Sequence, residues 1–426
     1  MTALDSSSAI PGYFDSPWPC EDGGPRRQMI PRGAELKLRS GSNLCATSRS
    51  QVMCNMVVLR APGEVFLQGS TGPTEDSSGW IERIDPISLR PLVRSPDLEA
   101  GRVWWAGGVA AHANGSLYVW QGRWVHKLDC DCRPIASREL PYDTPYNSML
   151  VLSDGNLVIK NLVRDRSQRS HFSVLEPERL ELIGPPVEIP EASVARIAKD
   201  IVPQGEFIYV LGIDTALRYR YAGGRLDRDE EWKARYRILP DGQQSFAWDP
   251  IVSGGSIWFL DDGDNKGFRG TFANCGLDEA TPLRLARVNT GDSNDFEQFQ
   301  PFAAPHATIC NPPLFDSKRS IAVAFDTANS LLCGLRHRAP GEFERLWEKP
   351  FGAGFHMMLF SDTGELVVND FYRGEDNLVV LDIVTGVELG RVGTGSPVQS
   401  VVFPAPGFAR DIYYTSFMTV ARIFQE

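Results

Sequence analysis

The sequence predicts an all-β protein: a single β-propeller of eight blades, whose ring is closed by an N-terminal strand that completes the last, C-terminal blade. A short pattern recurs eight times along the 426 residues: a polar residue, three or four mostly apolar residues, a turn and a β-rich run. The polar residues that open successive units lie 39 to 62 residues apart. A repeat of about 40–50 residues with four short strands is the signature of a propeller blade. The last unit lacks a fourth strand, which the other terminus can supply.

The strands are clearest in the first, second and seventh units, which span residues 55–96, 108–140 and 356–392. Each contains runs rich in Val, Ile, Leu and aromatic residues, separated by turn residues. The fourth unit, roughly 196–240, has weaker outer strands, and its charged stretch 225–237 is equally compatible with a short helix. A seven-bladed ring is therefore the alternative.

The two ends of the chain indicate how the ring closes. The eighth unit stops after its third strand, Thr419–Phe424, and an isolated β-rich run, Ala34–Arg39, precedes the first complete unit. Pairing these segments would remove an unpaired sheet edge. We therefore expect Ala34–Arg39 to be the outer strand of blade eight, within a propeller that spans residues 31–426. Residues 1–30 are rich in Pro, Gly and Ser and are expected to form an N-terminal strap over a face or rim.

Composition narrows the classes of partner and the compartment. The formal net charge is −11, whereas nucleic acids and anionic membranes call for a basic surface. No run of about 18 apolar residues predicts a membrane span, and the N-terminal residues lack the pattern of a secretory signal. The eight cysteines show no zinc-site spacing, which fits a reducing compartment. We therefore expect a cytoplasmic protein without a nucleic-acid or membrane partner.

One polar position per unit forms a column that a propeller would gather around its axis. Its members are Asn55, Gly108, Asn147, Asp200, Asp249, Asn311, His356 and Gln399. Carboxylates aimed into a narrow channel repel each other, and a bound cation, a shared proton or water would relieve this. We predict that Asp200, Asp249 and Asn311 hold a divalent cation (Ca²⁺, Mg²⁺ or Mn²⁺), with His356 as general base or ligand. The alternative is that these side chains cap the strand starts around a water-filled axis.

Further polar residues are expected at the same end of the ring, which we call the mouth. Second strands end there, and the loops between second and third strands are long at residues 69–79, 161–171 and 261–282. His306 is the second candidate for general base. The predicted substrate-binding residues are Asn55, Asn147, Lys160, Asn161, Asp262, Asn369, Asp370 and Trp105. A solvated rim explains the polar residues of this set equally well, and the long loops could instead bind a protein partner.

Two turns carry a resemblance to a known group. Val380–Gly386 (Val-Leu-Asp-Ile-Val-Thr-Gly) and Ile84–Leu89 (Ile-Asp-Pro-Ile-Ser-Leu) are similar to turns of quinoprotein and YVTN-type propeller blades. The chain resembles the broad propeller superfamily that also holds the gluconolactonase and strictosidine-synthase group. That resemblance implies a propeller fold and, from the gluconolactonase group, an axial divalent cation bound by Glu, Asn and Asp. No regular tryptophan-docking motif is apparent, and the sequence has no adjacent Cys-Cys pair.

These observations predict a small-molecule enzyme with its active site at the mouth and metal-assisted hydrolase, lyase or isomerase chemistry. The sequence has no Gly-rich phosphate loop, HExxH motif, GxSxG elbow or Rossmann fingerprint. Two alternatives stay open: a non-catalytic scaffold that binds a protein through its long loops, and a quinone-dependent oxidoreductase.

Overall fold

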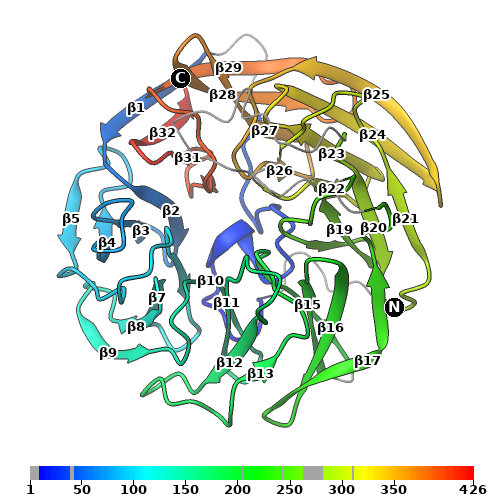
Figure 1. Cartoon of the computed structure of the whole chain (residues 1–426). Helices are drawn as coiled ribbons and strands as arrows, with labels where there is room; N and C mark the ends of the chain where they lie inside the picture. The colour runs from blue at the N-terminus through cyan, green and yellow to red at the C-terminus, as the bar shows by residue number, and fades with distance from the viewer. Residues whose placement is uncertain (1–8, 39–42, 204, 241–242, 262–281, 309–310) are drawn as a thin grey trace.

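In the described residues, 32 strands form eight four-stranded sheets, arranged as the blades of a closed ring (Figure 1). The computed structural model describes residues 9–38, 43–203, 205–240, 243–261, 282–308 and 311–426. The predicted all-β, eight-bladed propeller is confirmed, and the seven-bladed alternative is wrong. Residues 225–235 form a strand, not a helix. The helical structure described is one 3-10 turn, η1 (Glu21–Gly23), and none of the described helices could span a membrane.

The first four blades each run from the innermost to the outermost strand. Blade one contains β2 (Cys54–Leu59), β3 (Val65–Ser70), β4 (Gly79–Ile84) and β5 (Pro91–Arg94). Blade two contains β6 (Gly108–Ala111), β7 (Leu117–Gln121), β8 (Trp124–Leu128) and β9 (Pro134–Glu139). Blade three contains β10 (Tyr146–Val151), β11 (Leu157–Asn161), β12 (His171–Leu175) and β13 (Val187–Glu188). Blade four contains β14 (Ala198–Val202), β15 (Gly205–Leu211), β16 (Thr215–Ala222) and β17 (Arg225–Arg235).

The remaining blades complete the ring. Blade five contains β18 (Ile251–Ser253), β19 (Ser256–Leu260), β20 (Leu285–Asn289) and β21 (Phe296–Phe299). Blade six contains β22 (Leu314–Asp316), β23 (Ile321–Asp326), β24 (Leu331–Ala339) and β25 (Glu342–Pro350). Blade seven contains β26 (Met358–Phe360), β27 (Glu365–Tyr372), β28 (Glu375–Asp382) and β29 (Glu388–Ser396). Blade eight contains β30 (Ala405–Pro406), β31 (Ile412–Thr415), β32 (Thr419–Gln425) and β1 (Leu44–Ser50).

Side chains are buried near the axis and exposed at the rim, so the inner and outer strands of a blade differ in sequence pattern. All six residues of β2 are buried, whereas the outer strand β5 is mostly exposed. Inner strands pack on neighbouring blades through both faces, so they read as continuous apolar runs. Neighbouring blades interlock through large side chains: the Trp258 ring of blade five stacks on Phe315 of blade six, 4.1 Å between centroids.

Aromatic side chains also join blades at their outer turns. In four of the blade pairs, a Tyr or Trp donates a hydrogen bond to a backbone carbonyl in an outer turn of the next blade. These bonds are Tyr118 to Pro177 (2.6 Å), Trp232 to Asn289 (3.1 Å), Trp347 to Ile383 (2.9 Å) and Tyr413 to Pro86 (3.0 Å). The sequence pattern missed this regularity because the tyrosines lie on second strands and the tryptophans on fourth strands. Both turns that carried the family resemblance are among these docking points.

The predicted closure by an N-terminal strand is confirmed, but the predicted segment was wrong. β1 pairs antiparallel with β32 over seven residues, from Leu44 with Gln425 to Ser50 with Thr419. Residues 34–38 form no strand; instead, the backbone N–H groups of Lys37 and Leu38 donate to the carboxylate of Glu365 (2.9 and 2.6 Å). Ala34–Arg39 alternates apolar and polar residues and Leu44–Ser50 does not, so periodicity favoured the wrong segment. The pairing with β32 identifies the strand that closes the ring.

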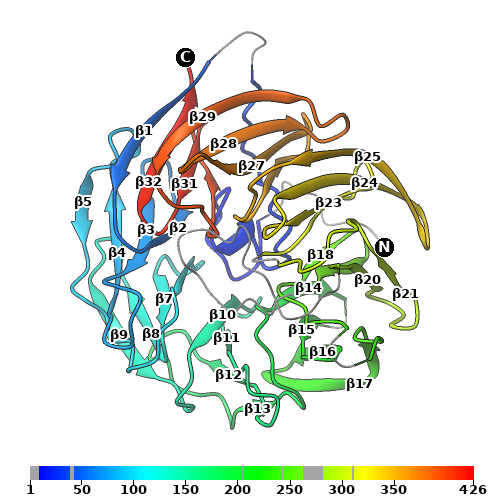
Figure 2. The same cartoon turned by 45° about the horizontal axis from the view of Figure 1, so that its top comes forward.

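The described N-terminal residues 9–38, which we call the axial segment, run through the centre of the ring (Figures 1 and 2). The strap is therefore placed along the axis and not over a face or rim. Backbone N–H groups of the inner strands donate to its carbonyls in five blades. These bonds are Leu59 to Trp18 (2.9 Å), Ala111 to Pro19 (2.7 Å), Lys199 to Pro25 (2.7 Å), Val252 to Arg26 (2.8 Å) and Leu359 to Met29 (2.9 Å).

Proline at Cys45 or Ala46 tests the closing strand. Successive N–H groups of a strand point to opposite sides, so one of the two substitutions removes a ladder bond to β32. That variant should lose about 1–3 kcal/mol of unfolding free energy in urea titrations. Unchanged stability in both variants would contradict the assignment of β1 as the closing strand.

Candidate functional site

Three asparagines of the predicted column link neighbouring blades. The side-chain amides of Asn55, Asn147 and Asn311 are buried. Each donates to a carbonyl in the connection that leads into the next blade: Gly107 (2.9 Å), Val194 (2.7 Å) and Gly354 (2.6 Å), respectively. A buried polar group is stable only when it is hydrogen-bonded, and these bonds meet that requirement at the axis. Asn55, Asn147 and Asn311 thus hold the blade starts together, as the capping alternative supposed.

The two column aspartates lie apart. Asp200 is the third of the five residues of β14, inside the strand and not at its start, and pairs with Arg26 (2.6 Å). Asp249 precedes β18, is fully buried, and pairs with Arg196 (2.8 Å) and Arg27 (3.4 Å). The sequence alignment of the column was therefore out of register in blade four.

As placed, Asp200, Asp249 and Asn311 do not fit a divalent cation. Two guanidinium groups flank the Asp249 carboxylate, and the Asn311 amide faces carbonyls of Gly354 and Val401. Within the described ranges, no group of three or more His, Cys, Asp or Glu residues could hold a metal ion. The positive charge that the sequence argument required comes instead from Arg27 and Arg196.

Around Asp249, buried charged residues form a network that we call the axial ionic cluster. Its members are Glu21, Asp22, Arg27, Arg196, Asp249 and His356. Arg27 lies 2.8 Å from Glu21 and 2.6 Å from Asp22, and His356 Nδ1 lies 2.8 Å from Asp22. Three of the six residues come from the axial segment, which therefore completes the charge balance of the channel.

Burial and pairing set the protonation of this cluster. Burial raises the pKa of Glu21, against the opposing effect of Arg196 and Arg27. Burial would also raise the pKa of Asp22, but Arg27 and His356 outweigh it and lower that pKa. For His356, burial lowers the pKa, and the nearby Asp22 only partly compensates. His356 also stacks on Phe403, 3.9 Å between ring centroids, which fixes its plane.

Lys160 is the most strongly perturbed base among the predicted mouth residues. It is fully buried, and its amine donates to the carbonyls of Asn161 (2.7 Å) and Ser193 (3.1 Å). Burial lowers the pKa of Lys160 to about 7, although Asp249 acts in the opposite direction. Such perturbed groups are concentrated at functional sites.

The other predicted mouth residues mainly support loops. Asn161 accepts from the N–H of His171 (2.6 Å) and donates to Thr144 (3.0 Å). Asn369 accepts from the N–H groups of Gly354 and Phe355, and Asp370 accepts from that of Gly352 (2.9 Å). The bonds of Asn369 and Asp370 position the chain that leads into blade seven.

Trp105, His306 and Asp262 complete the predicted set. The indole N–H of Trp105 is buried and has no described partner, and the Arg196 guanidinium lies 5.5 Å from the ring. His306 is exposed, in a left-handed conformation (φ 55°) between β21 and β22. Asp262 lies outside the described residues. Gly108 leaves no space for a ligand, because a Cβ there would lie 2.1 Å from the Trp120 ring.

Sequence reasoning missed several buried polar groups. Trp248 precedes Asp249, and its buried indole N–H also lacks a described partner. Asp376 receives hydrogen bonds from Tyr414 (2.6 Å) and Ser400 (2.8 Å), and burial raises its pKa to about 7. One feature of the sequence could have indicated the ionic cluster: the charged pairs Glu21-Asp22 and Arg26-Arg27 lie within an otherwise Pro- and Gly-rich segment.

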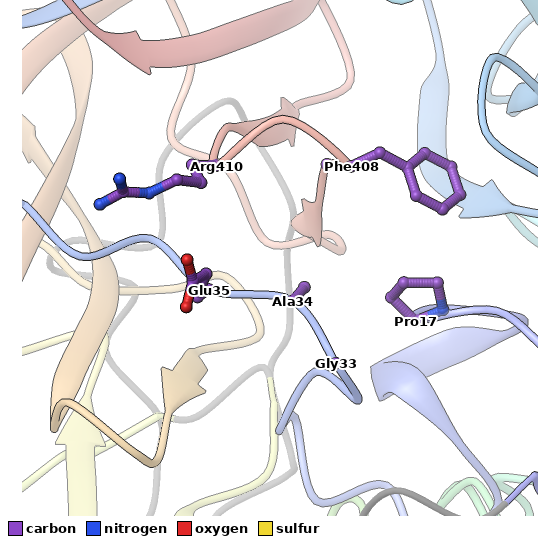
Figure 3. A pocket seen from close by; sticks show the side chains of 7 residues that line it. Pro17, Gly33, Ala34, Glu35, Phe408 and Arg410 are labelled. Carbon is purple, nitrogen blue, oxygen red and sulfur yellow. The ribbon is translucent and has the colours of Figure 1, made fainter.

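Two surface cavities lie among the described residues away from the ionic cluster. One, of about 260 Å³, is formed where the axial segment meets blade eight, with the Phe408 and Pro17 rings on one side and Arg410 and Glu35 on the other (Figure 3). The other, of about 480 Å³, lies beside β16 and β17 of blade four. Neither contains the column residues.

Comparisons with known proteins show the fold. No family model matches the chain, and no curated protein matches it. A quinohemoprotein alcohol dehydrogenase from Comamonas testosteroni is similar in structure, with a TM-score of 0.66, 10% identity, and coverage of 98% of this chain and 81% of that one. A europium-containing methanol dehydrogenase gives a TM-score of 0.58 at 10% identity, covering 95% and 89%. Sqt1 from Chaetomium thermophilum, bound to the N-terminus of ribosomal protein L10, gives 0.52 at 11% identity, covering 88% and 97%.

These likenesses show that the chain has the β-propeller fold, and the propeller fold that the resemblance of its turns implied is confirmed. These structures include enzymes and a protein-binding propeller, so the shared fold does not select a function.

Replacing Arg27 tests whether an internal cation balances the buried carboxylates. Arg27→Met leaves Glu21, Asp22 and Asp249 with Arg196 as the one arginine of the cluster. We expect a loss of about 3–5 kcal/mol of unfolding free energy at pH 7. The loss should shrink as the pH falls, because unpaired buried carboxylates bind protons more readily in the folded state.

The matched control is Arg26→Met, which removes the neighbouring arginine from the half-buried pair with Asp200. That substitution should cost about 1 kcal/mol or less. Equal losses in the two variants, measured by urea titration, would contradict the assigned role of the cluster.

The lowered pKa of Lys160 should make the unfolding free energy of the protein depend on pH. Between the folded pKa of about 7 and the unfolded value near 10.5, the unfolded chain binds one more proton than the folded chain at this residue. Stability of the wild type relative to Lys160→Met should therefore rise with pH above 7, by at most about 1.4 kcal/mol per pH unit. Lys318→Met, at an exposed lysine, should show no such slope. A flat difference for Lys160→Met would show that the amine stays charged in the fold.

Proposed function

We propose that the protein is an enzyme that acts on a small organic molecule at the mouth, by proton transfer at Lys160. The observation that carries this proposal is a fully buried amine with a pKa near 7, close enough to Asp249 and Arg196 for both charges to influence it. An amine with this pKa exists in both protonation states near neutral pH, which suits a general base or acid. The expected cytoplasmic location goes with this proposal and rests on composition.

The surroundings of Lys160 suggest how a substrate would be held. The Trp105 ring lies 5.5 Å from the guanidinium of Arg196, and Trp248 precedes Asp249 in the chain. The indole N–H groups of both tryptophans have no described acceptor. Such groups can donate to a carbonyl or hydroxyl oxygen while the rings stack on an apolar face. A small hydroxylated carbonyl compound, such as a lactone, offers both features.

His356 is the second proton-transfer group of the proposal. Asp22 contacts its Nδ1, and Phe403 stacks on its ring, so the orientation of the imidazole is fixed. A carboxylate beside one ring nitrogen favours the tautomer in which the other nitrogen can accept a proton. Lactone hydrolysis, elimination and isomerisation next to a carbonyl all need one base and one acid, so the proposal covers hydrolase, lyase and isomerase chemistry. The proposed chemistry does not use the predicted cation, because Asp200, Asp249 and Asn311 do not fit one.

A scaffold that binds a protein partner is the second candidate. The observation that favours it is the commitment of Asn55, Asn147 and Asn311 to bonds between blades, which leaves the loops as the variable part of the mouth. In that case the residues of the axis serve stability alone.

Lys160→Met, compared with Lys318→Met, separates the two candidates. We would measure turnover of a panel of lactones, including glucono-δ-lactone, and of 2-hydroxy acids, with folding of each variant checked by circular dichroism. We expect Lys160→Met to lower kcat by about 10²–10⁴-fold and Lys318→Met to leave it unchanged. In the wild type, kcat/KM should change with an apparent pKa near 7.

Turnover that survives Lys160→Met would refute the role of this residue. A purified protein that turns over none of the panel and captures a protein partner would favour the scaffold. Visible absorbance of the purified protein would favour the quinone-dependent alternative.

A further inference from the structure

We infer that the axial channel is a peptide-binding site, and that its resident ligand is the chain's own axial segment, which can exchange with the same peptide added in trans. The ligand class is an extended peptide, rich in Pro and Gly, that carries an acidic pair and an arginine pair. This site does not depend on the enzyme proposed above.

The ring is complete without the axial segment. β1 begins at Leu44, after the segment, and supplies the strand that closes blade eight. In the described structure, no residue between 9 and 38 belongs to a blade sheet, and the described pairing of β type is one isolated bridge between Tyr13 and His112. The segment therefore occupies the channel as a ligand would, and the eight sheets do not include it.

The channel recognises the main chain of the segment. Five inner strands, from blades one, two, four, five and seven, each donate one N–H to a segment carbonyl, at 2.7–2.9 Å. Proline contributes a carbonyl and no N–H, so Pro19 and Pro25 place acceptors on this path without adding donors that would need partners. Asp22, Arg27 and Met29 have φ values of 53–58°, a left-handed conformation that side chains rarely adopt freely. Contacts with the channel must hold this conformation in place.

The charges of the segment and the channel are complementary. Arg27 reaches Asp249 of blade five, and Asp22 reaches His356 of blade seven. In the reverse direction, Glu21 lies 3.5 Å from Arg196 of blade four. The segment and the channel thus each carry positive and negative groups, so a peptide bound in another register would place like charges together.

Both ends of the segment are also held by specific contacts. The Tyr13 hydroxyl accepts from the N–H of Val151 (2.9 Å) in blade three. At the other end, Arg410 donates to the carbonyl of Leu36 (2.9 Å), beside the cavity of Figure 3. The Glu365 carboxylate accepts from the N–H groups of Lys37 and Leu38. These contacts define a binding site along the whole channel for one peptide of about 30 residues.

The test uses the full chain, folded first and cut afterwards. A protease recognition sequence is inserted between Leu38 and Asn43, and the folded protein is cleaved. A labelled synthetic peptide of residues 9–38 is then added, and its incorporation is followed by fluorescence anisotropy and native mass spectrometry. We expect the cleaved segment to stay with the ring after gel filtration and to exchange with the labelled peptide at one peptide per ring.

Variant peptides test the anchor without altering the ring. A peptide with Arg27→Met should compete at least tenfold more weakly than the wild-type peptide, whereas Arg26→Met should compete within threefold of it. Three results would overturn the inference: loss of the folded ring when the segment leaves, no exchange of the cleaved segment, or equal competition by the two variants. Exchange is measured without substrate, so failure of the proposed enzyme would leave this result interpretable.

Discussion

The inner edges of the blades impose the requirement on which the rest of this structure depends. Eight innermost strands face one narrow channel, and backbone N–H groups on that side have no neighbouring strand to pair with. An unpaired buried N–H costs about as much as a lost hydrogen bond. The axial segment supplies carbonyls to five of the blades, so a channel that would otherwise hold water becomes a packed polar interior. Trp18 and Met29 are buried there as a consequence.

Filling the channel with chain rather than solvent then decides its electrostatics. Asp249 is fully buried, and a buried carboxylate needs an opposite charge at close range. Arg27 and Arg196 provide it, and their own charge is matched by Glu21 and Asp22. Burial also lowers the pKa of Lys160 to about 7 and, in the third strand of blade seven, raises that of Asp376 to about 7. The packing that stabilises the ring therefore also produces its most unusual acid–base groups.

Two kinds of contact between blades keep the ring rigid around this interior. Near the axis, the amides of Asn55, Asn147 and Asn311 donate to the chain that enters the next blade. At the outer turns, Tyr or Trp side chains such as Trp347 do the same. Polar residues that recur once per repeat are thus explained first by the repeat itself. A functional role is better sought in groups that the repeat does not require, such as Lys160 and the indole N–H of Trp105.

Repeat length and alternation are local properties of a chain, so the all-β class, the eight units and closure by an N-terminal strand could be predicted from the sequence. The sequence also placed most of the polar column at the axis. It could not choose Leu44–Ser50 over Ala34–Arg39, or find that Asp200 was out of register, because strand pairing is a contact between distant segments. Only the tertiary structure showed that Arg27 takes the place predicted for a cation. Charge balance in a buried channel depends on every group that reaches it, and three members of this cluster arrive from a segment without periodicity.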